Sequence, residues 1–199
     1  MNQSRENILL TALELFSQNG YEAVSVGMIA GALGLSKGAM YRHFKNKRDL
    51  FDQILRRMEE RDASAARAFQ LPECAIRDSS EDYANASIEA LLGFSEAQFD
   101  YWTADPFAAP FRKMLTLEQY RSPEMNALYQ NYLGAGPIEY TRDLLASLAV
   151  PQPESEALWL YGPMFFLFTL YDSDPASARS LAQAHFVAAR ARLIRSKEE

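Results

Sequence analysis

The chain has 199 residues, of which 48% are hydrophobic and 23% charged, and its formal net charge is −6. This composition is typical of folded domains and excludes a chain that is disordered throughout. The single cysteine, Cys74, excludes an intramolecular disulfide and any site that needs two thiols, and two histidines are too few for a histidine-rich metal centre.

The N-terminal quarter predicts four helices joined by short turns. Apolar residues recur at helical spacing from Ile8 to Phe16, and Gly20 ends this first helix. Serine and asparagine side chains can cap the following three helices, and Gly34 separates the second from the third. The capping signals predict helices over 25–33, 36–44 and 46–69, with Ser25, Ser36 and Asn46 as their caps.

Prolines divide the remainder of the chain. A capping side chain precedes a proline at Asp105-Pro106, Ser122-Pro123 and Asp174-Pro175, which predicts a helix start at each place. Residues 134–137 contain two glycines and a proline and are expected to break or kink the helix that contains them. With a loop over 71–80 and no alternating strand pattern, the fold class is all-α with about nine helices; those of the second part are predicted over 80–102, 106–118, 123–148, 153–172 and 175–196.

The acidic net charge argues against a nucleic-acid partner, but the charge is unevenly distributed. Residues 1–52 carry six basic and five acidic residues, or +1, which leaves −7 for the other 147. Five of the positive charges, and His43, lie between Lys37 and Arg48, where there is no acidic residue. A basic segment of this kind is a local electrostatic signal for nucleic-acid binding, although a solvated charged surface has the same composition.

The helices over 25–33 and 36–44, with the turn at Gly34, form a helix-turn-helix pattern. Small residues at Gly38 and Ala39 would let the second helix approach the floor of the major groove. Met40 and Phe44, four residues apart, are expected to face inward and hold this helix. The outward positions are Lys37, Tyr41 and Arg42.

The segment IAGALGLSKGAMYRHFKNKRDL, residues 29–50, resembles the DNA-binding domain of the TetR family of bacterial transcriptional regulators, as does ALELF at 12–16. The resemblance covers about residues 5–52. It implies a DNA-binding domain over 1–46 and an α-helical effector-binding and dimerisation domain over 47–199, with the helix 47–69 as connector.

Carried over position by position, the resemblance implies that Lys37 and Arg42 read guanines. It implies phosphate contacts for Ser25, Tyr41, His43 and Lys47. Gly27 has no side chain where some members of the family carry a base-reading arginine, so no operator sequence is predicted. The full predicted DNA-binding set is Ser25, Ser36, Lys37, Gly38, Ala39, Tyr41, Arg42, His43 and Lys47.

Residues 80–172 are rich in aromatic side chains, of which Tyr and Trp bring a polar group into apolar surroundings. Packing in the core explains many of them, and the same composition suits a mostly apolar small-molecule site. The resemblance implies an effector bound between the middle helices, without cofactor or metal. The candidate lining residues are Trp102, Phe107, Phe111, Tyr120, Tyr129 and Tyr140.

The last two predicted helices carry apolar stripes, which suggest an interface. The resemblance implies a homodimer built as a four-helix bundle from these helices, and with it a palindromic operator on double-stranded DNA. The candidate interface residues are Trp159, Met164, Phe168, Leu181, Ala184 and Ala188. With no signal-peptide pattern and no apolar run of membrane-spanning length, we expect a cytoplasmic protein that does not span a membrane.

These observations predict a repressor that a small, mostly apolar ligand releases from its operator. Two alternatives remain at this point. One is a helical small-molecule-binding protein or enzyme with an incidental helix-turn-helix, although no paired titratable groups indicate an enzyme. The other is a TetR-like activator, since activation and repression differ in where the operator lies.

Overall fold

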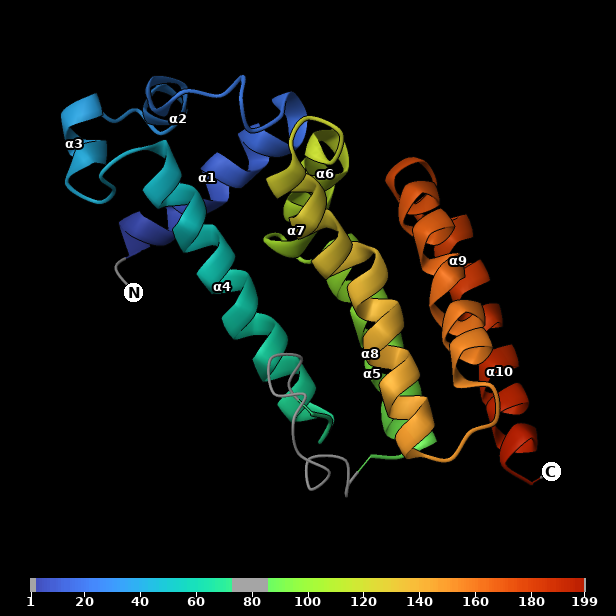
Figure 1. Ribbon diagram of the computed structural model, residues 1–199. Coiled ribbons are helices and arrows are strands. Elements are labelled where there is room, and N and C mark those ends of the chain that lie inside the picture. Colours follow the sequence, from blue (N-terminus) through green and yellow to red (C-terminus); the bar gives the residue numbers. More distant parts are fainter. Residues whose placement is uncertain (1–2, 73–85, 199) are drawn as a thin grey trace. The chain divides into compact units, whose positions relative to one another are not determined.

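The computed structural model describes residues 3–72 and 86–198 (Figure 1). Cys74, and most of the loop predicted over 71–80, lie outside these residues. The described residues form ten α-helices and no strand, which confirms the all-α class. The helices are α1 (Gln3–Asn19), α2 (Val26–Ala32), α3 (Lys37–Tyr41), α4 (Lys47–Ala68), α5 (Ile88–Ala104), α6 (Ala108–Glu118), α7 (Pro123–Leu133), α8 (Ala135–Ser147), α9 (Pro153–Ser173) and α10 (Pro175–Glu198).

The predicted caps of the short N-terminal helices are all present. Ser25, Ser36 and Asn46 each accept a hydrogen bond from the backbone N–H three residues further on, at 3.2, 3.1 and 2.8 Å. The carboxylate of Asp49 accepts from the backbone N–H of Lys45 at 2.8 Å, and this bond lowers the pKa of Asp49. Each helix start is therefore fixed by side chains that the sequence places there.

The helix predicted over 123–148 is divided into α7 and α8, which accounts for the tenth helix. The division falls at Gly134, which lies between the two helices. A Cβ on Gly136 would collide with the carbonyl oxygen of Asn131. The close approach of these two backbone segments therefore requires a glycine, as the predicted break indicated.

The described chain separates into two compact units. Unit 1 comprises Met1–Arg61 and Ala104–Tyr129, and unit 2 comprises Asp62–Thr103 and Gln130–Glu199. In unit 1, α6 packs along α1 and α2 packs against both α1 and α3. The predicted boundary between a DNA-binding domain (1–46) and an effector-binding domain (47–199) is a division by function and stays a prediction. By packing, α6 belongs with the N-terminal helices.

The C-terminal end of α1 is held by a buried carboxylate. Gly20 ends the helix with φ of +82° and donates its N–H to Phe16 O at 2.8 Å. The side chain of Glu118, on α6, is 1% exposed and accepts the backbone N–H of Tyr21 at 3.0 Å. Arg121 lies 3.7 Å from the same carboxylate and supplies the opposite charge that a buried carboxylate needs.

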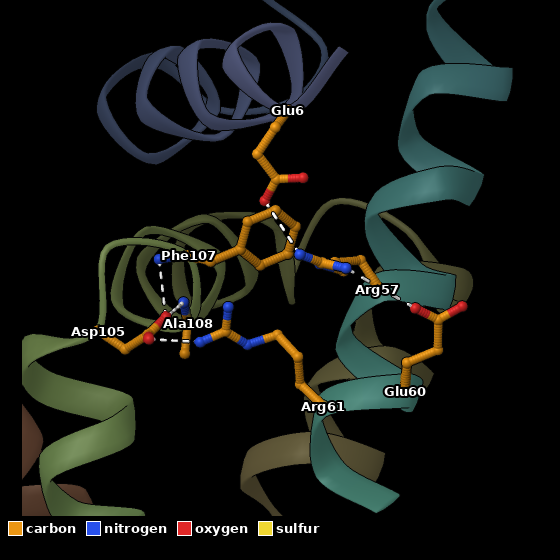
Figure 2. A network of polar contacts seen from close by, with 7 residues as sticks. All are labelled: Glu6, Arg57, Glu60, Arg61, Asp105, Phe107 and Ala108. Carbon is orange, nitrogen blue, oxygen red and sulfur yellow. Dashed lines mark hydrogen bonds and ion pairs between the residues drawn. The ribbon is translucent and has the colours of Figure 1, made fainter. Parts of the chain in front are cut away.

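A polar network holds the part of α4 that belongs to unit 1 (Figure 2). Arg57 pairs with Glu6 of α1 at 3.3 Å. Arg61 pairs with Asp105, whose other carboxylate oxygen accepts the backbone N–H groups of Phe107 and Ala108 at 2.8 and 2.9 Å. Asp105 therefore caps this turn as predicted, and residues 106–107 form a turn that leads into α6, two residues before the helix begins.

In unit 2, α8 packs against α9, and α9 lies beside α10 (Figure 1). A bidentate ion pair joins the last two helices, with Arg192 Nε and Nη2 2.6 and 2.7 Å from the carboxylate of Glu156. The Arg192 guanidinium also lies over the ring of Trp159 at 4.9 Å. Within the described residues, no helix is both long and apolar enough to cross a membrane.

Candidate nucleic-acid interface

Helix α3 is packed in place by the two residues predicted to face inward. Met40 is 1% exposed and Phe44 is also buried. Gly34, with φ of +64°, ends α2, and the backbone N–H of Leu35 reaches back to Ala30 O at 2.8 Å. A left-handed residue with this bond closes the helix in a tight turn. The pair α2–α3 is therefore a helix-turn-helix, as predicted.

The predicted DNA-binding residues lie in unit 1, on or next to this helix-turn-helix. The hydroxyl oxygens of Ser25 and Ser36 accept the capping hydrogen bonds, so each O–H can still donate to a phosphate. Ala39, His43 and Lys47 are half-buried. The exposed members of the set are Ser25, Ser36, Lys37, Gly38, Tyr41 and Arg42.

Three cations on this surface are not engaged by the protein's own carboxylates. Lys37, Arg42 and Lys45 are exposed, and none forms an ion pair with any residue that the structure describes. Lys45 was not among the predicted binding residues, although its place inside the basic segment is a signal for it. Cations without protein partners are available to neutralise phosphates.

The other two cations of the basic segment bind the protein itself. Lys47 donates to the backbone carbonyls of Tyr21 and Glu22 at 3.0 and 3.3 Å, and its ammonium lies 4.3 Å from the centre of the Tyr21 ring. Arg48 pairs with Asp52 at 2.8 Å and with Glu124 at 2.6 Å. Lys47 thus secures the segment after α1, and its predicted phosphate contact stays a prediction.

The six aromatic residues predicted to bind an effector are divided between the units. Trp102 and Tyr140 are buried in unit 2, where the Tyr140 hydroxyl donates to Pro72 O at 2.7 Å. Tyr120, in unit 1, is 88% exposed, which is incompatible with a place in the core. The other three, also in unit 1, are the buried Phe107 and Phe111 and the half-buried Tyr129.

A groove of about 440 Å³ lies along α5 and α10 in unit 2, and none of the six predicted residues lines it. Its apolar lining includes Phe99 and Phe186, and Asp100 and Arg179 pair across it at 2.6 Å. The rest of the lining is Glu96, Ala182, Gln183, Val187 and Arg190.

The residues predicted for a dimer interface fall on two different faces. Met164 and Phe168 are buried within unit 2, where Phe168 stacks on Phe99, so the structure corrects their assignment to the core. The apolar side chains that α9 exposes are instead Leu158 and Phe166. On α10 the predicted residues Leu181, Ala184 and Ala188 are exposed, together with Val187, Ala191 and Ile194, while Trp159 of α9 is half-buried.

Comparison with known proteins places these features in a family. Residues 8–54 match the tetR family of bacterial regulatory proteins. The transcriptional regulator AcrR of Shigella flexneri is 52% identical over 52 residues. That match covers 26% of this chain and 24% of AcrR, so the chain aligns with about a quarter of this relative's length.

Solved structures resemble the whole chain. The TetR-family regulator PfmR of Thermus thermophilus matches with a TM-score of 0.60 and 25% identity, over 92% of this chain and 96% of PfmR. SmeT of Stenotrophomonas maltophilia, in complex with triclosan, matches with a TM-score of 0.61 and 17% identity, over 93% and 90% of the two chains.

The three kinds of match agree with the geometry of α2 and α3, and the family is one of regulators rather than enzymes. Residues 8–54 therefore form a helix-turn-helix domain of the TetR family of bacterial transcriptional regulators, and the whole chain shares the fold of a TetR-family regulator.

Proposed function

We propose that the chain regulates transcription by inserting α3 into the major groove of operator DNA. The observation that carries this proposal is the exposed surface formed by α3 and the residues that follow it, where Lys37, Arg42 and Lys45 have no ion-pair partner among the described residues. Tyr41 is 54% exposed on the same helix. A surface of unpaired cations on a firmly packed short helix suits contact with phosphates and base edges.

The same proposal includes a homodimer on a palindromic operator. Phe166 on α9 and Val187 on α10 are more than 60% exposed, and the small residues of α10 allow a second helix to approach closely. A two-fold dimer would present two copies of α3 to half-sites about 34–36 Å apart, or one turn of DNA.

We further propose that the chain is a repressor, released by a small and mostly apolar ligand. SmeT, which shares the fold, is described as the repressor of a multidrug efflux pump and was solved with triclosan. Unit 2 buries Trp102 and Tyr140, which remain the candidates there for ligand contact. A ligand would lower operator affinity only as far as it binds the conformation that does not bind DNA more tightly than the one that does. Helix α4 contributes residues to both units and could connect them in such a change.

Arg42→Ala is expected to weaken operator binding by about 1 to 3 kcal/mol and to relax base preference at one position of each half-site. Arg56→Ala is the matched control, because Arg56 is also an exposed arginine of unit 1 but lies on α4, beyond the basic segment. Fluorescence anisotropy with labelled operator DNA measures both. Equal affinities for the two variants would contradict the assignment of α3 as the recognition helix.

A further inference from the structure

Gly27, the second residue of α2, lies directly beneath the side chain of Lys37. A Cβ built on Gly27 would be 2.8 Å from Lys37 Cε and 3.4 Å from its ammonium nitrogen. Carbon atoms in contact lie about 3.5–4.0 Å apart, so a side chain at this position would displace the lysine. The absence of a side chain at Gly27 is therefore what gives the Lys37 side chain its path across α2.

This path brings the Lys37 ammonium towards the side chain of Ser25. The hydroxyl oxygen of Ser25 is 3.6 Å from the same Cβ position that is 3.4 Å from the ammonium, so the two groups lie no more than about 7 Å apart and can both reach one phosphate group. Lys37 and Ser25 are both exposed, and Lys37 forms no ion pair with a described residue. An ammonium beside a hydroxyl that can donate is suited to an anionic oxygen.

We propose that Gly27 is a positioning residue for DNA binding, because it lets Lys37 lie beside Ser25 and bind a backbone phosphate rather than a guanine. This inference rests on the proposed function and deepens it, since it separates the roles of two exposed cations on one helix. Arg42, at the C-terminal end of α3, keeps the role of base reader, and Lys37 acts with Ser25 of the preceding helix.

A phosphate contact and a base contact have different signatures. Loss of a phosphate contact weakens binding to every sequence alike. It also reduces the slope of log Kobs against log salt concentration by about one. Loss of a base contact weakens binding to the preferred site alone. The role of Lys37 can therefore be measured with two duplexes, one carrying the site that the wild-type protein selects from random DNA and one of scrambled sequence.

The test compares Gly27→Ala with Gly31→Ala. Gly31 lies one turn further along α2, and a Cβ there meets nothing within 4 Å, so this variant makes the same chemical change without touching Lys37. Alanine favours a helix more than glycine does, so neither variant is expected to unfold at a lower temperature than the wild type. A loss of binding would then not come from a loss of folding.

Gly27→Ala is expected to weaken binding to both duplexes about fivefold at 0.15 M salt and to reduce the slope of log Kobs against log salt concentration by about one. Lys37→Ala should have the same two effects. Gly31→Ala should bind like the wild type. The double variant Gly27→Ala/Lys37→Ala should bind like Lys37→Ala alone, because both changes remove one contact. The inference is overturned if Gly27→Ala binds like Gly31→Ala, or if Lys37→Ala affects the selected site only. If the wild-type protein binds neither duplex, the proposed function itself fails.

Discussion

Gly20→Ala is expected to lower the free energy of unfolding by about 2 to 5 kcal/mol. Alanine at φ of +82° costs about 1–2 kcal/mol because its Cβ approaches the backbone. In addition, the new Cβ would collide with Glu118, which is buried and holds the N–H of Tyr21. Displacing a buried carboxylate from a hydrogen bond adds a further cost on the order of 1–3 kcal/mol. Urea denaturation followed by circular dichroism measures the total.

Gly34→Ala is the matched control for this variant. Gly34 also has a positive φ, of +64°, but a Cβ there meets nothing within 4 Å. Its substitution should therefore cost only the conformational part, about 1–2 kcal/mol. Because a dimer's stability depends on concentration, both variants are compared with the wild type at one protein concentration. Equal losses for the two variants would show that Glu118 does not hold the end of α1.

Phe166→Asp is expected to convert the proposed dimer to a monomer at micromolar concentration. Phe166 is 63% exposed on α9 and carries the largest apolar side chain of the exposed faces of α9 and α10. An aromatic side chain at the centre of an interface often contributes 2 kcal/mol or more, and an unpaired carboxylate buried there adds a desolvation cost, so the dissociation constant should rise by about a hundredfold or more. Light scattering coupled to size-exclusion chromatography measures the mass directly.

Leu117→Asp separates this effect from a general response to a new surface charge. Leu117 is 46% exposed on α6 in unit 1, so the same change of an exposed apolar side chain to Asp is made away from α9 and α10. This variant should remain dimeric. A dimeric Phe166→Asp protein, or a monomeric Leu117→Asp protein, would contradict the placement of the interface on the last two helices.

The sequence predicted the features that are encoded locally. Ser25, Ser36 and Asn46 cap helices because each bonds a backbone group three residues away, and no distant residue is needed. Met40 lies on α3 and Phe44 shortly after it, and their spacing of four residues alone indicated that both face inward. The break between α7 and α8 likewise follows from its glycines and proline.

The features that were missed depend on residues far apart in the chain. Lys47 binds the carbonyls of Tyr21 and Glu22, and Arg48 pairs with Glu124, so no local pattern distinguishes these cations from the unpaired Lys45. The sequence likewise could not show which of the aromatic effector candidates are buried or in which unit they lie, because tertiary packing decides the burial of an aromatic residue.

Helix α9 shows why an apolar pattern can predict the wrong face. Apolar residues occur on all its sides, so spacing cannot say which side packs inside the unit and which is exposed. Met164 and Phe168 are buried by the chain itself, whereas Leu158 and Phe166 are exposed. We therefore place the proposed interface on the exposed face of α9, with Leu158 and Phe166, and keep Leu181, Ala184 and Ala188 as its candidates on α10.

The central claim is that the surface of α3, presented twice by a homodimer, recognises a palindromic operator. Selection of bound duplexes from random DNA, followed by DNase I footprinting of the selected site, tests it most directly. We expect two protected half-sites of inverted sequence, with centres separated by about one helical turn or a multiple of it, and loss of protection with Arg42→Ala. A selection that enriches no sequence, or a footprint that Arg42→Ala leaves unchanged, would contradict the account.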